Sequence, residues 1–221
     1  MQPFDSLRDY IAEMEVRDNL LRIAQMDQDR YEMTAFGYRL DDRDKANAPA
    51  FLVERTRINA RWYETPVVAN VLNNYWSVAL ALGIDCVDEN PSKMYDAAVS
   101  RIMSFLDDNH RWRTIEPVIV DSSSAPCKEV ILHGEEADLL EFPWIRNNPA
   151  DGGQYISTGA VITEDPELGR NVGTHRMMIK GPRKVGLDLS TQSHAYAQVQ
   201  RAIKRGEKKV PVSVAIGIDR H

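Results

Sequence analysis

The sequence YISTGAVITEDPELGRNVGTHRMMI, residues 155–179, predicts a β-hairpin that decides the fold of the second half of the chain. Its turn is EDPELG, residues 164–169. Proline presets the backbone at the entry of such a turn, and glycine allows the positive φ needed to leave it. The runs on either side, residues 155–162 and 172–179, are expected to be the paired strands.

The segments around this hairpin also resemble strands broken by turn residues. Runs of strand length lie at residues 117–120, 129–132, 185–189 and 210–218. One helix is expected at about residues 193–205, with Val199, Ala202 and Ile203 packing and Gly206 ending it. Closely spaced strands of this kind predict a twisted antiparallel sheet or a partly closed barrel over residues 114–221.

The last of these runs, residues 210–218, is apolar enough to be a buried strand. The sequence contains no later element that could cover it or pair with its far side. We therefore expect that another chain covers it, or that the chain is part of a longer protein.

The first half alternates helical and strand patterns, which predicts a small α/β domain over residues 1–113. Helices are expected after a cap at Asp5 or Ser6, at residues 31–40, at residues 75–82, and from Asn90-Pro91 to about residue 107. The packing face of the last helix should contain Met94, Ala97, Ala98, Ile102 and Phe105. Strands are expected at residues 20–23, 50–53 and 66–69. The fold class is therefore α+β.

Composition excludes several classes of protein. A net charge of −6 argues against a nucleic-acid-binding surface, which would need clustered Lys and Arg. The two cysteines form no CxxC pair, so neither a disulfide framework nor a zinc knuckle is indicated. The N-terminus lacks a signal-peptide pattern, and no apolar run approaches a membrane span. These features predict a cytoplasmic protein.

Three polar side chains near the hairpin are candidates for a binding site. Asn171 can offer an amide oxygen to a cation, although the same residue can serve the turn alone. Arg176 shares a strand face with Val172, Thr174 and Met178, and a buried arginine needs an anionic partner. The alternative is an arginine on an exposed sheet edge. His175 points to the opposite face and is interpreted from the pattern as a structural residue.

His194 begins the predicted helix, where free backbone N–H groups favour an anion such as a phosphate. A divalent cation between Asn171 and His194 could bridge that phosphate, but the site would need a carboxylate. Asp188 and Glu207 are nearest in sequence, and neither pattern supports that role. The chain has no GxSxG, GxGxxG or Walker motif, so serine hydrolase, dinucleotide-binding and P-loop functions are not indicated.

Taken together, several stretches resemble the UbiD-like decarboxylases, which use prenylated FMN. The resemblance begins with SLRDYI at residues 6–11 and LLRI at residues 20–23, and continues with PVVAN at residues 66–70 and VALALG at residues 78–83. It extends through GQYISTGA at residues 153–160, DPELGRNVG at residues 165–173 with Arg176-Met177, and PVSVAIG at residues 211–217. Each stretch alone is a weak signal, whereas their combination is specific.

The resemblance implies that the small α/β domain is followed by a flavin-reductase-like split β-barrel that holds the cofactor, with the C-terminal domain absent from this sequence. It implies that Asn171 and His194 bind the metal, and that Arg176 belongs to the catalytic arginine–glutamate network. The implied cofactor contacts are Thr174, His175, Arg176, Asp188, Leu189, Ser190, Ser193 and His194. The implied cofactors are prenylated FMN, Mn²⁺ and K⁺.

The implied activity is reversible, non-oxidative decarboxylation of an aromatic or α,β-unsaturated carboxylic acid. Family members are about twice as long, and the metal-binding glutamate and both catalytic glutamates lie beyond the last strand seen here. A homo-oligomer, or a second chain that supplies the missing half, is therefore expected. Two alternatives remain open: a non-catalytic flavin-binding or assembly subunit, and a flavin reductase.

Overall fold

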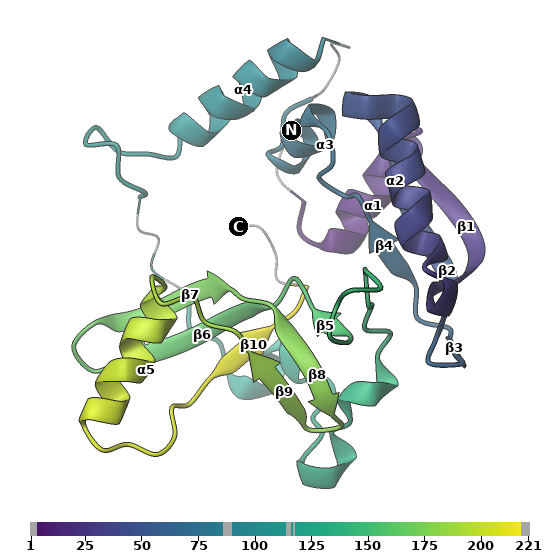
Figure 1. Ribbon diagram of the computed structural model, residues 1–221. Helices are drawn as coiled ribbons and strands as arrows, with labels where there is room; N and C mark the ends of the chain where they lie inside the picture. The colour runs from purple at the N-terminus through teal and green to yellow at the C-terminus, as the bar shows by residue number, and fades with distance from the viewer. Residues whose placement is uncertain (1–3, 86–89, 114–115, 117, 218–221) are drawn as a thin grey trace.

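The computed structural model describes residues 4–85, 90–113, 116 and 118–217. Its N-terminal part is built on a four-stranded sheet (Figure 1). β1 pairs in parallel with β2, and β3 and β4 pair antiparallel with β2. The bounds are β1 Leu20–Asp27, β2 Ala50–Ile58, β3 Arg61–Tyr63, β4 Val67–Ala69, α1 Leu7–Val16, α2 Glu32–Asp44, α3 Tyr75–Ala81 and α4 Pro91–Met103.

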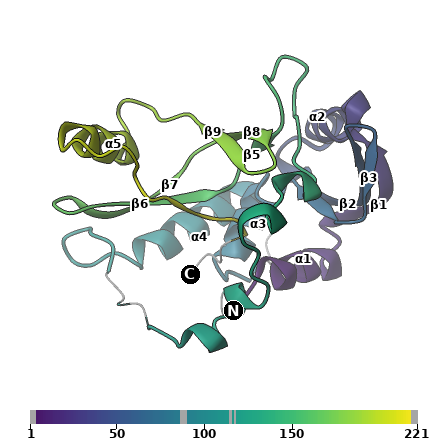
Figure 2. The same ribbon diagram turned by 90° about the horizontal axis from the view of Figure 1, so that it is seen from below.

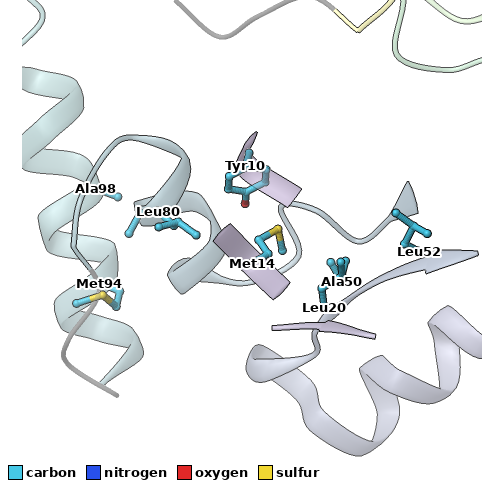
Figure 3. Close-up of a cluster of buried hydrophobic side chains, with 9 residues drawn as sticks. Tyr10, Met14, Leu20, Ala50, Leu52, Leu80, Met94 and Ala98 are labelled. Carbon is cyan, nitrogen blue, oxygen red and sulfur yellow. The ribbon is translucent and has the colours of Figure 1, made fainter. Parts of the chain in front are cut away.

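Helices cover both faces of this sheet because β2 is apolar on both sides. Ala50 and Leu52 face a cluster made with α1, α3 and α4, part of which is shown in Figure 3. Phe51 and Val53 face the other way, into a cluster with Met33 and Leu40 of α2. Side chains alternate along a strand, so one run of apolar residues supplies both layers. The expected α/β arrangement is confirmed for this part.

Local capping signals place the helix starts close to where the sequence predicts them. The Ser6 hydroxyl accepts a hydrogen bond from the Asp9 N–H at 3.2 Å, and the Asn90 side chain accepts one from the Ser92 N–H at 3.0 Å. The predicted face of α4 is only partly covered: Met94 and Ala98 are buried, whereas Ile102 and Phe105 are 37% and 36% exposed. The short β3 has no counterpart among the predicted strands.

The C-terminal part consists of two three-stranded antiparallel sheets, ordered β10-β6-β7 and β5-β8-β9 (Figures 1 and 2). The predicted hairpin is confirmed as β6 (Ala160–Asp165) and β7 (Gly169–Thr174). The chain changes sheet at residues 157–159 and 175–176, so each long predicted strand is divided in two. The remaining elements are β5 Tyr155–Ile156, β8 Met177–Gly181, β9 Lys184–Leu187, α5 His194–Lys204 and β10 Ser213–Ala215.

Two strand predictions in this half are wrong, and a third is confirmed only in part. Residues 118–120 and 129–132 form no strand, and Val118 and Ile119 are 86% and 95% exposed; Pro117 lies outside the described residues. The strand predicted at residues 210–218 is present as the short β10, but it is not buried: Val212 and Val214 are exposed, and Ile218 lies outside the described residues. A β-branched run becomes a strand only when another strand pairs with it. Within the described residues, the runs at 118–120 and 129–132 have no such neighbour.

The strands of the described residues form open sheets rather than a closed barrel. The expected α+β class is therefore confirmed, whereas the flavin-reductase-like barrel is not. The boundary predicted at residues 113/114 adjoins Thr114 and Ile115, which lie outside the described residues. Among the helices that the structure describes, none combines the length and apolar character needed to span a bilayer.

Residues 139–154 attach the C-terminal part to the N-terminal sheet. Arg61 makes a two-point ion pair with Glu141, at 2.9 and 2.7 Å, and the Tyr63 hydroxyl donates to the Leu140 carbonyl at 2.9 Å. Further along, the buried Gln28 donates to the Arg146 carbonyl at 2.9 Å. These bonds join residues about 80 to 118 positions apart in sequence, so they fix one part against the other.

Candidate functional site

The two faces of β7 differ in burial, and the partly buried face carries two of the candidate residues, Asn171 and His175. Asn171, Gly173 and His175 are partly buried, whereas Val172, Thr174 and Arg176 are exposed. Asn171 lies opposite Thr163 of β6, and its Nδ2 is 3.5 Å from the Thr163 hydroxyl oxygen. The side chain of Thr163 is buried. The amide of Asn171 is therefore held at its strand position by one weak hydrogen bond.

Gly173 brings the side chains on either side of it close together. A Cβ atom added at Gly173 would lie 2.9 Å from Nε2 of His175 and 3.8 Å from Nδ2 of Asn171. The first distance is shorter than real contacts of a Cβ atom allow. The absence of a side chain at Gly173 therefore leaves room for the His175 imidazole, which lies over this glycine on the same face as the Asn171 amide. Patterning alone did not indicate this role for Gly173.

Replacing Gly173 with alanine is expected to weaken flavin binding about tenfold, as is usual when a group that orients a ligand is moved. The added methyl group would displace the His175 imidazole, while the exposed face of β7 would be unaffected. Titration of the purified variant with FMN and Mn²⁺ would measure the effect. Gly153→Ala is the matched control, because its Cβ would make only an ordinary 3.6 Å contact with Met178. Equal affinity in both variants would contradict this role for Gly173.

The start of α5 is organised by serine hydroxyls. Ser193 caps the helix: its hydroxyl accepts from the Tyr196 N–H at 3.2 Å and donates to the Ser190 carbonyl at 2.8 Å. His194 is the first helical residue and is exposed. Of the other predicted contacts, Asp188 is exposed and Leu189 is partly buried. The first N–H groups of a helix have no intrahelical acceptor, so this end of α5 can receive an anion beside an accessible imidazole.

A buried carboxylate ties α5 to the hairpin. The side chain of Asp165 is 0% exposed and pairs with Arg205 at 2.7 Å and with Arg201 at 3.3 Å. Burial alone would raise the pKa of Asp165. The hydrogen bonds from Arg205 and from the Glu167 and Leu168 N–H groups outweigh burial and hold this pKa well below its usual range. Sequence inspection treated Asp165 only as a turn residue, although the i,i+4 spacing of Arg201 and Arg205 was visible.

Arg176 lies at the two-residue corner between β7 and β8 and is exposed. Of the two alternatives that the sequence left open, a buried strand position and an exposed sheet edge, the exposed position is the one observed. Within the described part of the chain, no ion pair and no side-chain hydrogen bond involves its guanidinium. Its donors are therefore not engaged by the residues around it.

The donor set fits part of a metal and phosphate site. An amide oxygen and an imidazole are both ligands that Mn²⁺ accepts, and a phosphate suits the start of α5. The described residues contain no cluster of three or more His, Cys, Asp or Glu side chains that could complete the site. Glu207 is engaged by Arg205 at 2.6 Å, which leaves it unsuited as the missing ligand.

Two family models match the chain. The 3-octaprenyl-4-hydroxybenzoate carboxy-lyase N-terminal domain matches residues 11–97, and the Rift-related domain of the same enzyme matches residues 118–221. The phenolic acid decarboxylase of Sedimentibacter hydroxybenzoicus is 28% identical to this chain, over 97% of this chain and 42% of that protein. The chain therefore spans less than half the length of this relative.

Solved structures agree with this likeness. The vanillic acid decarboxylase of Sedimentibacter hydroxybenzoicus in closed form has a TM-score of 0.80 and 26% identity, and covers 99% of this chain and 44% of its own. An evolved dimeric form of the UbiD-class enzyme HmfF from Pelotomaculum thermopropionicum, in complex with prFMN, has a TM-score of 0.73 and 26% identity. The match covers 98% of this chain and 45% of the HmfF chain. A related structure of the vanillic acid decarboxylase contains a further component, ShVdcD.

Proposed function

The chain belongs to the UbiD family of carboxy-lyases, and from this premise we propose that it is the flavin-binding portion of a decarboxylase. The reaction is the reversible, non-oxidative decarboxylation of an aromatic or α,β-unsaturated carboxylic acid. The observation that carries the proposal is the partly buried Asn171–Gly173–His175 face of β7, in the hairpin against which α5 packs. An amide and an imidazole lie close together there, on either side of a glycine, within the region that the Rift-related model matches.

The residues present can divide the binding of prenylated FMN and its ions among them. Asn171 and His194 would supply an amide oxygen and an imidazole nitrogen to Mn²⁺, and the first turn of α5 would receive the phosphate. The residues that would contact the cofactor are Thr174, His175, Asp188, Leu189, Ser190 and Ser193, and K⁺ would be a further ion of the site. The cofactor supplies an electron sink for the carbon that loses carbon dioxide. The protein groups bind and orient the reactants.

Arg176 is the catalytic residue of this portion. Its exposed guanidinium forms a bidentate pair with the substrate carboxylate and so orients it. By the family resemblance, the metal-binding glutamate and the acids that complete the network are expected from outside these residues. A second chain, or another portion of a longer protein, supplies them in the cytoplasm.

A second candidate function is a flavin-binding subunit without its own activity. One observation favours it: a related structure of the vanillic acid decarboxylase includes the component ShVdcD. In that case the partner supplies every acid, and this chain contributes only the cofactor platform.

One set of measurements tests the proposal. Intact-protein mass spectrometry and the absorbance spectrum identify the flavin that copurifies with the chain. Carbon dioxide release is then measured with benzoic and cinnamic acids, for the chain alone and for its complex with a copurifying partner. Decarboxylation only in the complex supports the proposal. Direct bleaching of bound flavin by NAD(P)H, without decarboxylation, would instead identify a flavin reductase.

A further inference from the structure

Asp165 is a buried carboxylate that belongs to two structural elements at once. It ends β6, and its side chain is 0% exposed. Its Oδ1 accepts hydrogen bonds from the N–H groups of Glu167 and Leu168 at 3.0 and 3.1 Å, which shapes the hairpin turn. A buried charge is costly unless it is paired and hydrogen-bonded. The fully buried position of Asp165 therefore depends on its cationic partners.

Those partners lie on α5 and at its end. Arg205 reaches Oδ2 of Asp165 at 2.7 Å, and Arg201 reaches Oδ1 at 3.3 Å. The two arginines are four residues apart and so lie on one face of the helix. The same face carries Gln198, which is 2% exposed and donates to the Gly169 carbonyl at 2.8 Å. Three side chains thus fix α5 along the hairpin.

This attachment connects the two predicted metal ligands. His194 is one turn before Gln198, and Asn171 is two residues after Gly169 on β7. A sliding or rotation of α5 along the hairpin would change the separation of the imidazole and the amide. It would also break the contacts of Asp165 with both arginines.

Gln198 indicates that other contacts hold α5 in this position against the hairpin. Its Oε1 atom is buried and has no hydrogen-bond donor among the described residues. A buried acceptor without a donor is unfavourable, and a small displacement of the helix would let water reach it. The contacts of Asp165 oppose that displacement. Departures from the usual rules of protein structure, such as a buried acceptor without a donor, are often found at functional sites.

We propose that Asp165, through Arg201 and Arg205, is a positioning residue that holds His194 of α5 in register with Asn171 of β7. This inference rests on the proposed function for the identity of the two ligands. Asp165 touches neither the metal nor the flavin. It acts only through the placement of the helix.

The test compares Asp165→Asn with Glu207→Gln in the full chain. Asparagine keeps an acceptor for the two turn N–H groups and removes the charge. The control replaces Glu207, the other carboxylate that pairs with Arg205. Its side chain is 42% exposed, and it does not belong to the hairpin. FMN affinity in the presence of Mn²⁺ is measured by flavin fluorescence, at a temperature where all variants have the wild-type circular dichroism spectrum. We expect about tenfold weaker binding for Asp165→Asn, within the range for residues that orient ligands, and no change for the control.

A second measurement does not depend on ligand binding. Nitroxide labels at the exposed positions Val172 and Ala197, with Cys86 and Cys127 replaced by serine, report the distance between β7 and α5. Asp165→Asn should broaden the distance distribution, and Glu207→Gln should leave it narrow. An unchanged distribution, or a folded Asp165→Asn with wild-type affinity, overturns the inference. Failure of the wild type to bind FMN with Mn²⁺ counts against the proposed function, and the distances then decide the inference alone.

Discussion

Replacing Arg176 with alanine is expected to lower turnover by roughly 10²- to 10³-fold while bound flavin is retained, the usual loss when a charge-stabilising donor is removed from an active site. Arg176 is exposed at the corner between β7 and β8 and has no carboxylate partner in the described part of the chain. Its donors are therefore available to a substrate carboxylate. Removing them costs substrate orientation but leaves the metal ligands in place. The measurement is carbon dioxide release by the complete enzyme that contains this chain, together with its flavin absorbance.

The matched control is Arg183→Ala, which removes an exposed arginine from the connection between β8 and β9. It should retain wild-type turnover. A full rate of decarboxylation in Arg176→Ala would show that the substrate carboxylate is bound elsewhere. Loss of flavin from the same variant would assign Arg176 to cofactor binding instead.

Removing either proposed metal ligand should release the metal and the flavin together. Asn171→Ala or His194→Ala is expected to weaken Mn²⁺ binding about 100-fold, at or above the loss seen when residues around a metal are changed. Because these two residues would hold the ion together with the cofactor, flavin occupancy should fall in parallel. Metal analysis and flavin absorbance of the purified variants measure both quantities.

Folding should be nearly unaffected in these variants. Asn171 makes only a 3.5 Å hydrogen bond to Thr163, and His194 is exposed, so neither contributes much to the core. Asn109→Ala serves as the control, because it removes an exposed asparagine from the segment after α4. Full flavin occupancy in Asn171→Ala or His194→Ala would show that the ion is bound by other groups.

Features that depend on neighbouring residues could be predicted from the sequence. The β6–β7 turn follows from Pro166 and Gly169, where φ is +74°. The start of α4 follows from Asn90-Pro91. The apolar spacing of α5 predicts its packing only in part: Ala202 is buried and Val199 partly buried, whereas Ile203 is 57% exposed. The alternation along β7 correctly separated His175 from Arg176. It did not indicate which of the two faces is exposed.

Strand formation at residues 118–120 and 129–132 could not be predicted, because it depends on a partner. Both runs are β-branched and apolar, as strands usually are, yet Val118 and Val130 are 86% and 72% exposed. Pairing contributes the hydrogen bonds and packing that make such a run a strand, and composition does not report it. The expectation of a partly closed barrel depended on the same partners.

The sequence by itself determined the family, the hairpin, the helix caps and the residue types available for binding a metal and a phosphate. These follow from φ preferences and from hydrogen bonds between residues a few positions apart. Only the tertiary structure decided that Asp165 is buried, that it joins Arg201 and Arg205, and that Gly173 leaves room for His175. The ion pairs span 36 and 40 residues, so the fold must first bring α5 to the hairpin.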